Sequence, residues 1–174
     1  MVKLSNEARF MVLEGDEYLT SPIDRRPKFH LYKPDIAILS GIAWDHINVF
    51  PTFEIYVDQF RKFIALIPEN GYLAYSSSDD VLSELCRETF PVKEIEGYAL
   101  PEYSIKNGIT SLHFNGKTYD LQVFGKHNLM NINGARLICN KIGVSNEDFL
   151  QAIASFKGAS KRLELEKKSE KTDV

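Results

Sequence analysis

The chain has 174 residues and a formal net charge of −3, with 44% hydrophobic and 26% charged residues, as in an ordinary globular domain. No segment approaches the ~20 consecutive apolar residues that a membrane-spanning helix needs, and the polar start of the chain lacks the apolar core of a secretory signal. The absence of a sustained basic surface argues against duplex nucleic acid as the main partner. Two cysteines, Cys86 and Cys139, are too few for a disulfide framework or a four-cysteine zinc site. We therefore expect buried thiols in a reducing cytoplasm.

Short apolar runs alternate with helical periodicity in the first part of the chain, which favours an α/β domain. Apolar runs without alternation are typical of buried parallel strands, and apolar residues spaced by three and four indicate amphipathic helices. A strand, helix, strand, helix order implies right-handed crossovers and a parallel sheet. The expected elements are strands at Phe10–Leu13, Asp35–Gly41 and Gly71–Tyr75, a helix over 53–67 with Thr52 as N-cap, and a helix begun by Ser78-Asp79-Asp80.

The second part of the chain changes character. Asn115-Gly116 stands between the apolar-rich runs Ile109–Phe114 and Tyr119–Phe124, which is a strong hairpin signal. A helix is predicted from about residue 128 to 142, ended by Gly143, and Ser145 caps a last helix. The predicted fold class is α/β, with a mostly parallel sheet flanked by helices and an added β-hairpin.

Two polar clusters follow predicted strands, where open α/β sheets place their ligands. Glu14-Gly15-Asp16-Glu17 directly follows the first strand, and Asp45-His46 comes shortly after the second. Carboxylate oxygens with few other protein ligands suit magnesium, which keeps several waters and takes phosphate oxygens. The alternatives are a solvated acidic loop, and a histidine that Asp45 merely orients.

The third cluster is Gly125-Lys126-His127-Asn128-Leu129-Met130-Asn131. Asn128 and Asn131 are three residues apart, so both amides can point to one side of the first helical turn. An amide offers a donor and an acceptor together, which is what reading a purine edge requires. The alternative is that one of these asparagines only caps the helix.

The fourth cluster is Phe156-Lys157-Gly158-Ala159-Ser160-Lys161-Arg162-Leu163-Glu164. A glycine loop with adjacent cations suits a phosphate group, although a solvated linker has the same composition. The charge balance also shifts here, since acidic residues prevail up to about Ser155 and basic residues prevail after it.

Taken together, the order and separations of these four clusters resemble the later part of the central ATPase domain of the Mur ligases, the ATP-dependent amide-bond-forming enzymes of peptidoglycan synthesis. The resemblance covers about Phe10 to Glu164. Glu14–Tyr18 followed by Asp24–Phe29 looks most like the branch that recycles murein tripeptide, with the UDP-N-acetylmuramate–L-alanine ligases as near relatives.

The resemblance implies roles for individual residues. Glu14 and His46 match the family's magnesium-binding pair, Asn128 and Asn131 match its adenine-contacting asparagines with His127 beside them, and Arg162 matches an arginine that reaches ATP phosphates. The implied cofactors are ATP and Mg²⁺. The implied reaction joins the tripeptide L-Ala-γ-D-Glu-meso-diaminopimelate to UDP-N-acetylmuramate through an acyl phosphate, in the cytoplasm.

The sequence also departs from the family pattern. Gly41 stands where relatives usually carry Asn, Lys161 stands where two adjacent arginines are common, and no Gly-x-x-Gly-Lys-Thr-like phosphate loop occurs. The resemblance therefore implies that residues 1–156 are a partial central ATP-binding domain and residues 157–174 the hinge before a further domain. We expect no turnover by this chain alone.

One further expectation depends on this interpretation. Without the family's first strand, a sheet edge and apolar side chains should be uncovered, so we expect the chain to self-associate.

The alternatives to a tripeptide-recycling ligase are a part of a UDP-N-acetylmuramate–L-alanine ligase, or a non-catalytic nucleotide-binding module that uses Glu14 and His46 structurally. A carboxylate/His metal hydrolase is disfavoured, because no second ligand pair has suitable spacing.

Overall fold

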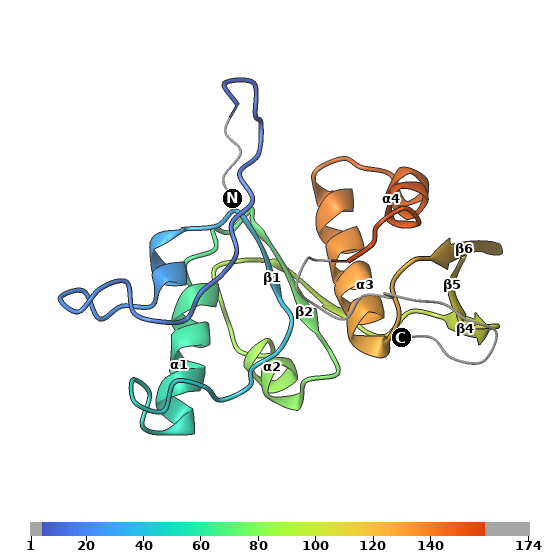
Figure 1. The fold of residues 1–174 in the computed structure, drawn as a ribbon. Helices are drawn as coiled ribbons and strands as arrows, with labels where there is room; N and C mark the ends of the chain where they lie inside the picture. Colours follow the sequence, from blue (N-terminus) through green and yellow to red (C-terminus); the bar gives the residue numbers. More distant parts are fainter. Residues whose placement is uncertain (1–4, 159–174) are drawn as a thin grey trace.

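The computed structural model describes residues 5–158, which form two three-stranded sheets with helices packed against them (Figure 1). In chain order the elements are η1 (Lys28–Leu31), β1 (Ile36–Leu39), α1 (Phe53–Ile64), β2 (Tyr72–Ser76), α2 (Asp80–Leu85), β3 (Glu94–Tyr98), β4 (Tyr103–Lys106), β5 (Ile109–Phe114), β6 (Lys117–Leu121), α3 (Lys126–Lys141) and α4 (Asn146–Ile153).

The first sheet is parallel and has the order β1-β2-β3. Successive side chains point to opposite faces, and both faces of this sheet are covered. Ala37, Leu39 and Leu73 pack with α1, α2 and η1 in the largest core cluster. Tyr72 and Ala74 pack on the other face with Leu137 of α3. The predicted parallel sheet with helices on both faces is confirmed.

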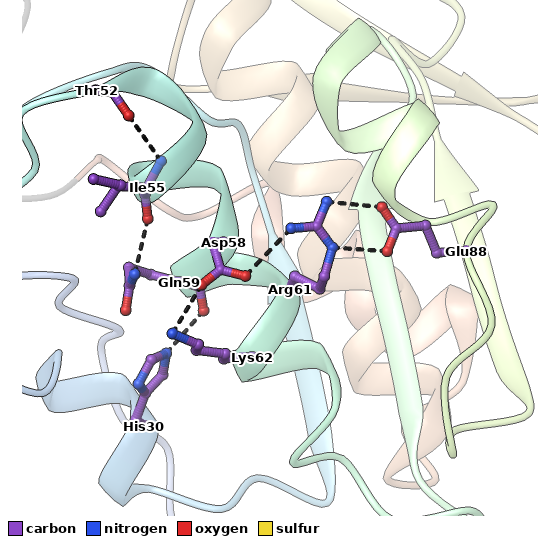
Figure 2. Close-up of polar contacts among 8 residues, drawn as sticks. All are labelled: His30, Thr52, Ile55, Asp58, Gln59, Arg61, Lys62 and Glu88. Atoms are coloured by element: carbon purple, nitrogen blue, oxygen red, sulfur yellow. Dashed lines mark hydrogen bonds and ion pairs between the residues drawn. The ribbon is translucent and has the colours of Figure 1, made fainter.

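Helix α1 is anchored at both ends by polar contacts, which Figure 2 draws. The hydroxyl of its N-cap Thr52 accepts from the amide of Ile55, as the sequence predicts. Near the C-terminus, the Arg61 guanidinium donates to both carboxylate oxygens of Glu88 at 2.8 and 2.9 Å. His30 of η1 contacts the carbonyl of Gln59 through Nε2 at 2.8 Å. These contacts fix α1 against η1, which precedes the parallel sheet, and against the segment between α2 and β3.

The second sheet is antiparallel, with the order β4-β5-β6. Asn115 and Gly116 both have positive φ, at 48° and 76°, as a two-residue hairpin turn between β5 and β6 requires. The predicted hairpin is therefore confirmed, but it belongs to a sheet of its own and is not added to the parallel sheet. Leu112 and Leu121 of this sheet pack against α3 and α4 in a second core cluster.

Helix α3 connects the two sheets and runs antiparallel to the parallel strands. Its last residue, Lys141, is paired with Glu94 at the start of β3, whereas Asn133 donates to the carbonyl of Ala99 just beyond the end of that strand. Since Asn133 precedes Lys141 in the helix, the first turns of α3 lie beyond the carboxyl ends of the parallel strands (Figure 1).

The expected buried strand at Phe10–Leu13 is wrong. These residues form no strand, and their exposures are 51, 74, 92 and 52%. An apolar run becomes a strand only where a neighbouring strand satisfies its backbone groups, and among residues 5–158 no segment pairs with this run. Strand β1, the expected neighbour, is the edge of its sheet in the described part of the chain and pairs only with β2.

Other differences concern elements with weak patterns. Strands β3 and β4 were not predicted, because Glu94–Tyr98 and Tyr103–Lys106 carry charged and glycine residues in place of apolar runs. Helix α1 ends at Ile64, before the predicted 67, and α3 begins at Lys126, before the predicted 128. Within residues 5–158, none of the helices combines the length and apolar character that crossing a bilayer would take.

The two cysteines are free thiols, as expected, but they are half-buried and not fully buried. Cys86 packs against the first core cluster and Cys139 against the second. Burial raises the pKa of the Cys86 thiol to about 12 and also raises that of Cys139, so neither is disposed to react as a thiolate.

Candidate functional site at the carboxyl edge of the parallel sheet

The segment from Ser40 to Phe50 follows β1 and carries His46. It is neither helix nor strand, and hydrogen bonds hold its shape. The carbonyl of His46 accepts from the amides of Val49 and Phe50 at 2.7 and 2.9 Å, and the indole nitrogen of Trp44 donates to the carbonyl of Phe50 at 3.0 Å. His46 itself has a φ of 54°, a conformation that residues other than glycine seldom adopt.

An acidic side chain lies against the His46 ring. Glu17 Oε1 is 3.6 Å from His46 Nε2, and the hydroxyl of Tyr56, in the first turns of α1, donates to the same oxygen at 3.4 Å. The Tyr18 ring meets the His46 ring edge-on, with centroids 4.7 Å apart. Burial and the charge of Glu17 raise the pKa of the buried Tyr56, so this hydroxyl stays protonated and donates.

The predicted ligand Glu14 is exposed and lines a cavity of about 910 Å³ beside β1. Glu17 and Asp45 line the same cavity. Asp16 forms an ion pair with Lys28, whose ammonium lies 2.6 Å from the carboxylate. This contact holds the pKa of Asp16 below its ordinary value. Of the acidic run 14–17, the carboxylate that contacts His46 is that of Glu17.

The donor chemistry at this edge fits a hard cation better than a transition metal. The carboxylates of Glu17 and Asp45 lie within 4.0 Å of the His46 imidazole, and within residues 5–158 no three His, Cys, Asp or Glu side chains converge as a ready cage. Magnesium needs no such cage, because it is held by one or two carboxylates and completes its shell with water and phosphate oxygens. The residues present are thus compatible with Mg²⁺.

The start of α3 carries the predicted amide pair. Its N-cap is Gly125, with a φ of 88°, and no side chain caps the helix, so the alternative that an asparagine is the N-cap is wrong. Asn128 Nδ2 donates to the carbonyl of Phe124 at 2.7 Å, which ties the first turn to the preceding loop. Asn131 Nδ2 contacts His127 Nε2 at 3.1 Å, so these two side chains share one side of the helix.

The His46 segment and the start of α3 lie at the same edge of the parallel sheet. The first follows the carboxyl end of β1. The second lies beyond the carboxyl end of β3, because α3 runs antiparallel to the strands. The sequence predicts a cation and a purine site at one edge; the segment that carries His46 and the start of α3 lie there, whereas Glu14 lines the cavity beside β1.

The fourth cluster is only partly described. Lys157 and Gly158 follow α4, and Gly158 has a φ of 102°. Arg162, the predicted phosphate ligand, and Lys161 lie outside the described residues. The predicted division at residue 156 therefore also remains a prediction.

Two residues of this edge were missed by sequence reasoning. Tyr56 lies within the predicted helix 53–67, and its hydroxyl contact with Glu17 has no local sequence signature. Asp79 was read only as part of a helix start, yet its carboxylate also bonds the segment after β1. Both contacts join segments distant in sequence, so no spacing pattern could have revealed them.

Comparison with known proteins finds similarity to one family. The family model described as the Mur ligase middle domain matches residues 1–139. The UDP-N-acetylmuramate–L-alanyl-γ-D-glutamyl-meso-2,6-diaminoheptandioate ligase of Haemophilus influenzae is 29% identical over 167 residues, covering 91% of this chain and 37% of that protein. The UDP-N-acetylmuramate–L-alanine ligase of Renibacterium salmoninarum is 31% identical over 145 residues, covering 76% of this chain and 31% of that protein.

Solved structures share the fold. A UDP-N-acetylmuramate:L-alanyl-γ-D-glutamyl-meso-diaminopimelate ligase from Neisseria meningitides superposes with a TM-score of 0.73 at 24% identity, over 85% of this chain and 48% of that one. A MurF ligase from Thermotoga maritima, solved in complex with ADP, has a TM-score of 0.61 at 21% identity, over 78% and 33% of the two chains. The chain spans about a third of the length of the curated relatives it matches.

Proposed function

The chain belongs to the Mur ligase family through its middle domain, and we propose that it is the ATP-handling part of a peptidoglycan ligase. The ligase proposed joins the murein tripeptide to UDP-N-acetylmuramate by way of an acyl phosphate, in the cytoplasm, during peptidoglycan recycling. The relatives from Haemophilus influenzae and Neisseria meningitides, whose names give this activity, support the tripeptide as substrate.

A second candidate is a UDP-N-acetylmuramate–L-alanine ligase. It is favoured by one specific observation, the relative from Renibacterium salmoninarum, which is slightly more identical than the tripeptide ligase but over a shorter part of the chain. Both candidates use UDP-N-acetylmuramate and differ in the incoming amine.

Within the proposed site, Glu14 and His46 hold Mg²⁺, and Asn128, Asn131 and His127 contact adenine. When bound, Mg²⁺ neutralises charge on the transferred phosphoryl group. Asn131 and His127 contact each other at the start of α3, which leaves the Asn131 carbonyl oxygen as an acceptor and its second amide hydrogen as a donor for the base. Arg162 is proposed to reach the phosphates. The observation that carries the proposal is the position of His46 and α3's first turns at one edge of the parallel sheet.

Calorimetry with Mg-ATP tests the nucleotide site. Asn131→Ala should weaken binding by ~1–3 kcal/mol, because a base edge loses its amide partner. Asn70→Ala is the matched control: Asn70 is exposed and stands just before β2, at the opposite edge of the sheet. Equal affinities for wild type, Asn131→Ala and Asn70→Ala would overturn the adenine assignment and leave only a structural role for the amide.

An assay of ADP formation tests the ligase assignment. With UDP-N-acetylmuramate and the tripeptide, the 174-residue chain should show no turnover, because it has no Gly-rich Lys-Thr loop to hold the β- and γ-phosphates. Turnover with the tripeptide would refute this expectation but support the tripeptide ligase. Turnover with L-alanine alone would favour the second candidate.

A further inference from the structure

The carboxylate of Asp79 connects two segments that are far apart in the sequence. Its Oδ1 accepts from the amide of Leu82 at 2.9 Å and so caps α2. Its Oδ2 accepts from the amide of Ile42 at 2.7 Å, in the segment after β1. One side chain therefore serves both as the N-cap of α2 and as the anchor of the segment that carries His46.

Ile42 holds that segment to the core of the protein. Its side chain is buried, with 8% exposure, within the first core cluster, whereas Gly41, Ala43, Trp44 and Asp45 are exposed. Beyond Ile42, the hydrogen bonds of the segment up to Phe50 are mostly internal ones. The Asp79 contact thus joins the start of an otherwise self-bonded segment to the parallel sheet.

We propose that Asp79 is a positioning residue for the site at the carboxyl edge: by holding the amide of Ile42, it sets where the Trp44-Asp45-His46 turn stands. The inference rests on the proposed function for its link to Mg-ATP, but the geometry of the turn can be measured without any ligand. A carboxylate suits the role, because it accepts from two amides at once and a charged acceptor makes the stronger bond.

Substituting Asp79 by serine separates the two roles. Serine is a good N-cap, so α2 should keep its first turn, but the shorter side chain cannot also reach Ile42. Asp80→Ser is the matched control, because Asp80 lies in the first turn of the same helix and carries the same charge. Circular dichroism should show the same helical content in the two variants, because α2 keeps a capping side chain in both.

The fluorescence of Trp44 reports the position of the turn directly, since Trp44 is the single tryptophan of the chain and its indole nitrogen donates a hydrogen bond within this segment. Asp79→Ser should shift its fluorescence emission to longer wavelength and increase its quenching by acrylamide, relative to both wild type and Asp80→Ser. Emission and quenching identical to those of Asp80→Ser would overturn the inference, whatever the binding data show.

Calorimetry with Mg-ATP then tests the link to the site. We expect about threefold to tenfold weaker binding by Asp79→Ser than by Asp80→Ser, as for the loss of one positioning hydrogen bond. Undiminished affinity despite a displaced Trp44 would overturn the link between Asp79 and the site. Absence of binding by the wild type would contradict the proposed function, and the Trp44 signal would still decide whether Asp79 holds the turn.

Discussion

Glu17 lies against His46, with 3.6 Å between Oε1 and Nε2, and both side chains are half-buried. The contact joins the acidic run after residue 13 to the segment after β1, two parts of the chain that the predicted site requires to be close together. It also involves a different carboxylate from the expected ligand, Glu14, which lines the neighbouring cavity.

This difference can be tested by replacing each glutamate with glutamine. If Glu14 is the magnesium ligand, Glu14→Gln should weaken Mg²⁺ or Mn²⁺ binding about tenfold or more, whereas Glu17→Gln should have a smaller effect, because Glu17 acts on the His46 ring and not on the cation. Calorimetry with each metal ion alone measures both. The reverse order of effects would contradict the Glu14 assignment and make Glu17 the ligand.

Gly134 allows α3 to approach the parallel sheet closely. A Cβ at this position would come within 2.5 Å of Ile38 Cδ1 and 2.7 Å of Tyr98 Cζ. Ile38 is 40% exposed and can move, but Tyr98 is 3% exposed and confined. Gly134→Ala should therefore lower the free energy of unfolding by about 1–2 kcal/mol, since overpacking outweighs the helical preference for alanine.

Urea unfolding measures this effect, and Gly15→Ala is the control, because a Cβ at Gly15 meets nothing within 4 Å. A Gly134→Ala protein as stable as the wild type would show that α3 can shift away from the sheet without loss.

His30 should make the stability pH-dependent between about pH 7 and pH 5.5. Burial against α1 lowers its pKa from the ordinary value of 6.5, so near pH 6 the unfolded chain binds more protons than the folded one. The free energy of unfolding must then fall as the pH is lowered through this range. The carboxyls whose pKa values are lowered, among them Asp16 and Asp58, act only at more acidic pH.

Urea unfolding at several pH values measures the slope. His30→Gln, which keeps a donor for the carbonyl of Gln59 (Figure 2), should flatten it. A slope that persists in His30→Gln would mean that another group is responsible.

The sequence predicts self-association because of an uncovered sheet edge, and the exposed run Phe10–Leu13 offers a surface for it. The run is flanked by Arg9 and Glu14, so antiparallel pairing with a second copy places each arginine opposite a glutamate. Such a pair satisfies backbone groups and buries four apolar residues of each copy. Gel filtration with light scattering should show a dimer or larger species.

Val12→Lys should shift this equilibrium to the monomer, whereas Ile23→Lys should not. The two residues are matched, with 92 and 96% exposure, but Ile23 lies outside the run. A wild-type chain that is monomeric at high concentration would contradict the prediction. So would equal effects of Val12→Lys and Ile23→Lys on the fraction of monomer.

Local patterns predicted the elements that depend on local chemistry. Thr52 and Ser145 cap α1 and α4 as expected, and Asn115-Gly116 forms the expected hairpin turn. The same reasoning failed at Phe10–Leu13, because apolar character reveals a preference for burial and does not supply the partner strand. It also missed β3 and β4, whose pairing is set by neighbours and not by their own composition.

The amino-acid sequence by itself determined the family, the parallel α/β character and the position of the Asp45-His46 pair after a strand, because these depend on residue type and order. Only the tertiary structure decided which carboxylate meets His46, which residue caps α3 and which acid holds the amide of Ile42. Those contacts are made between segments remote along the chain, and their partners are chosen by how the sheet and its helices pack.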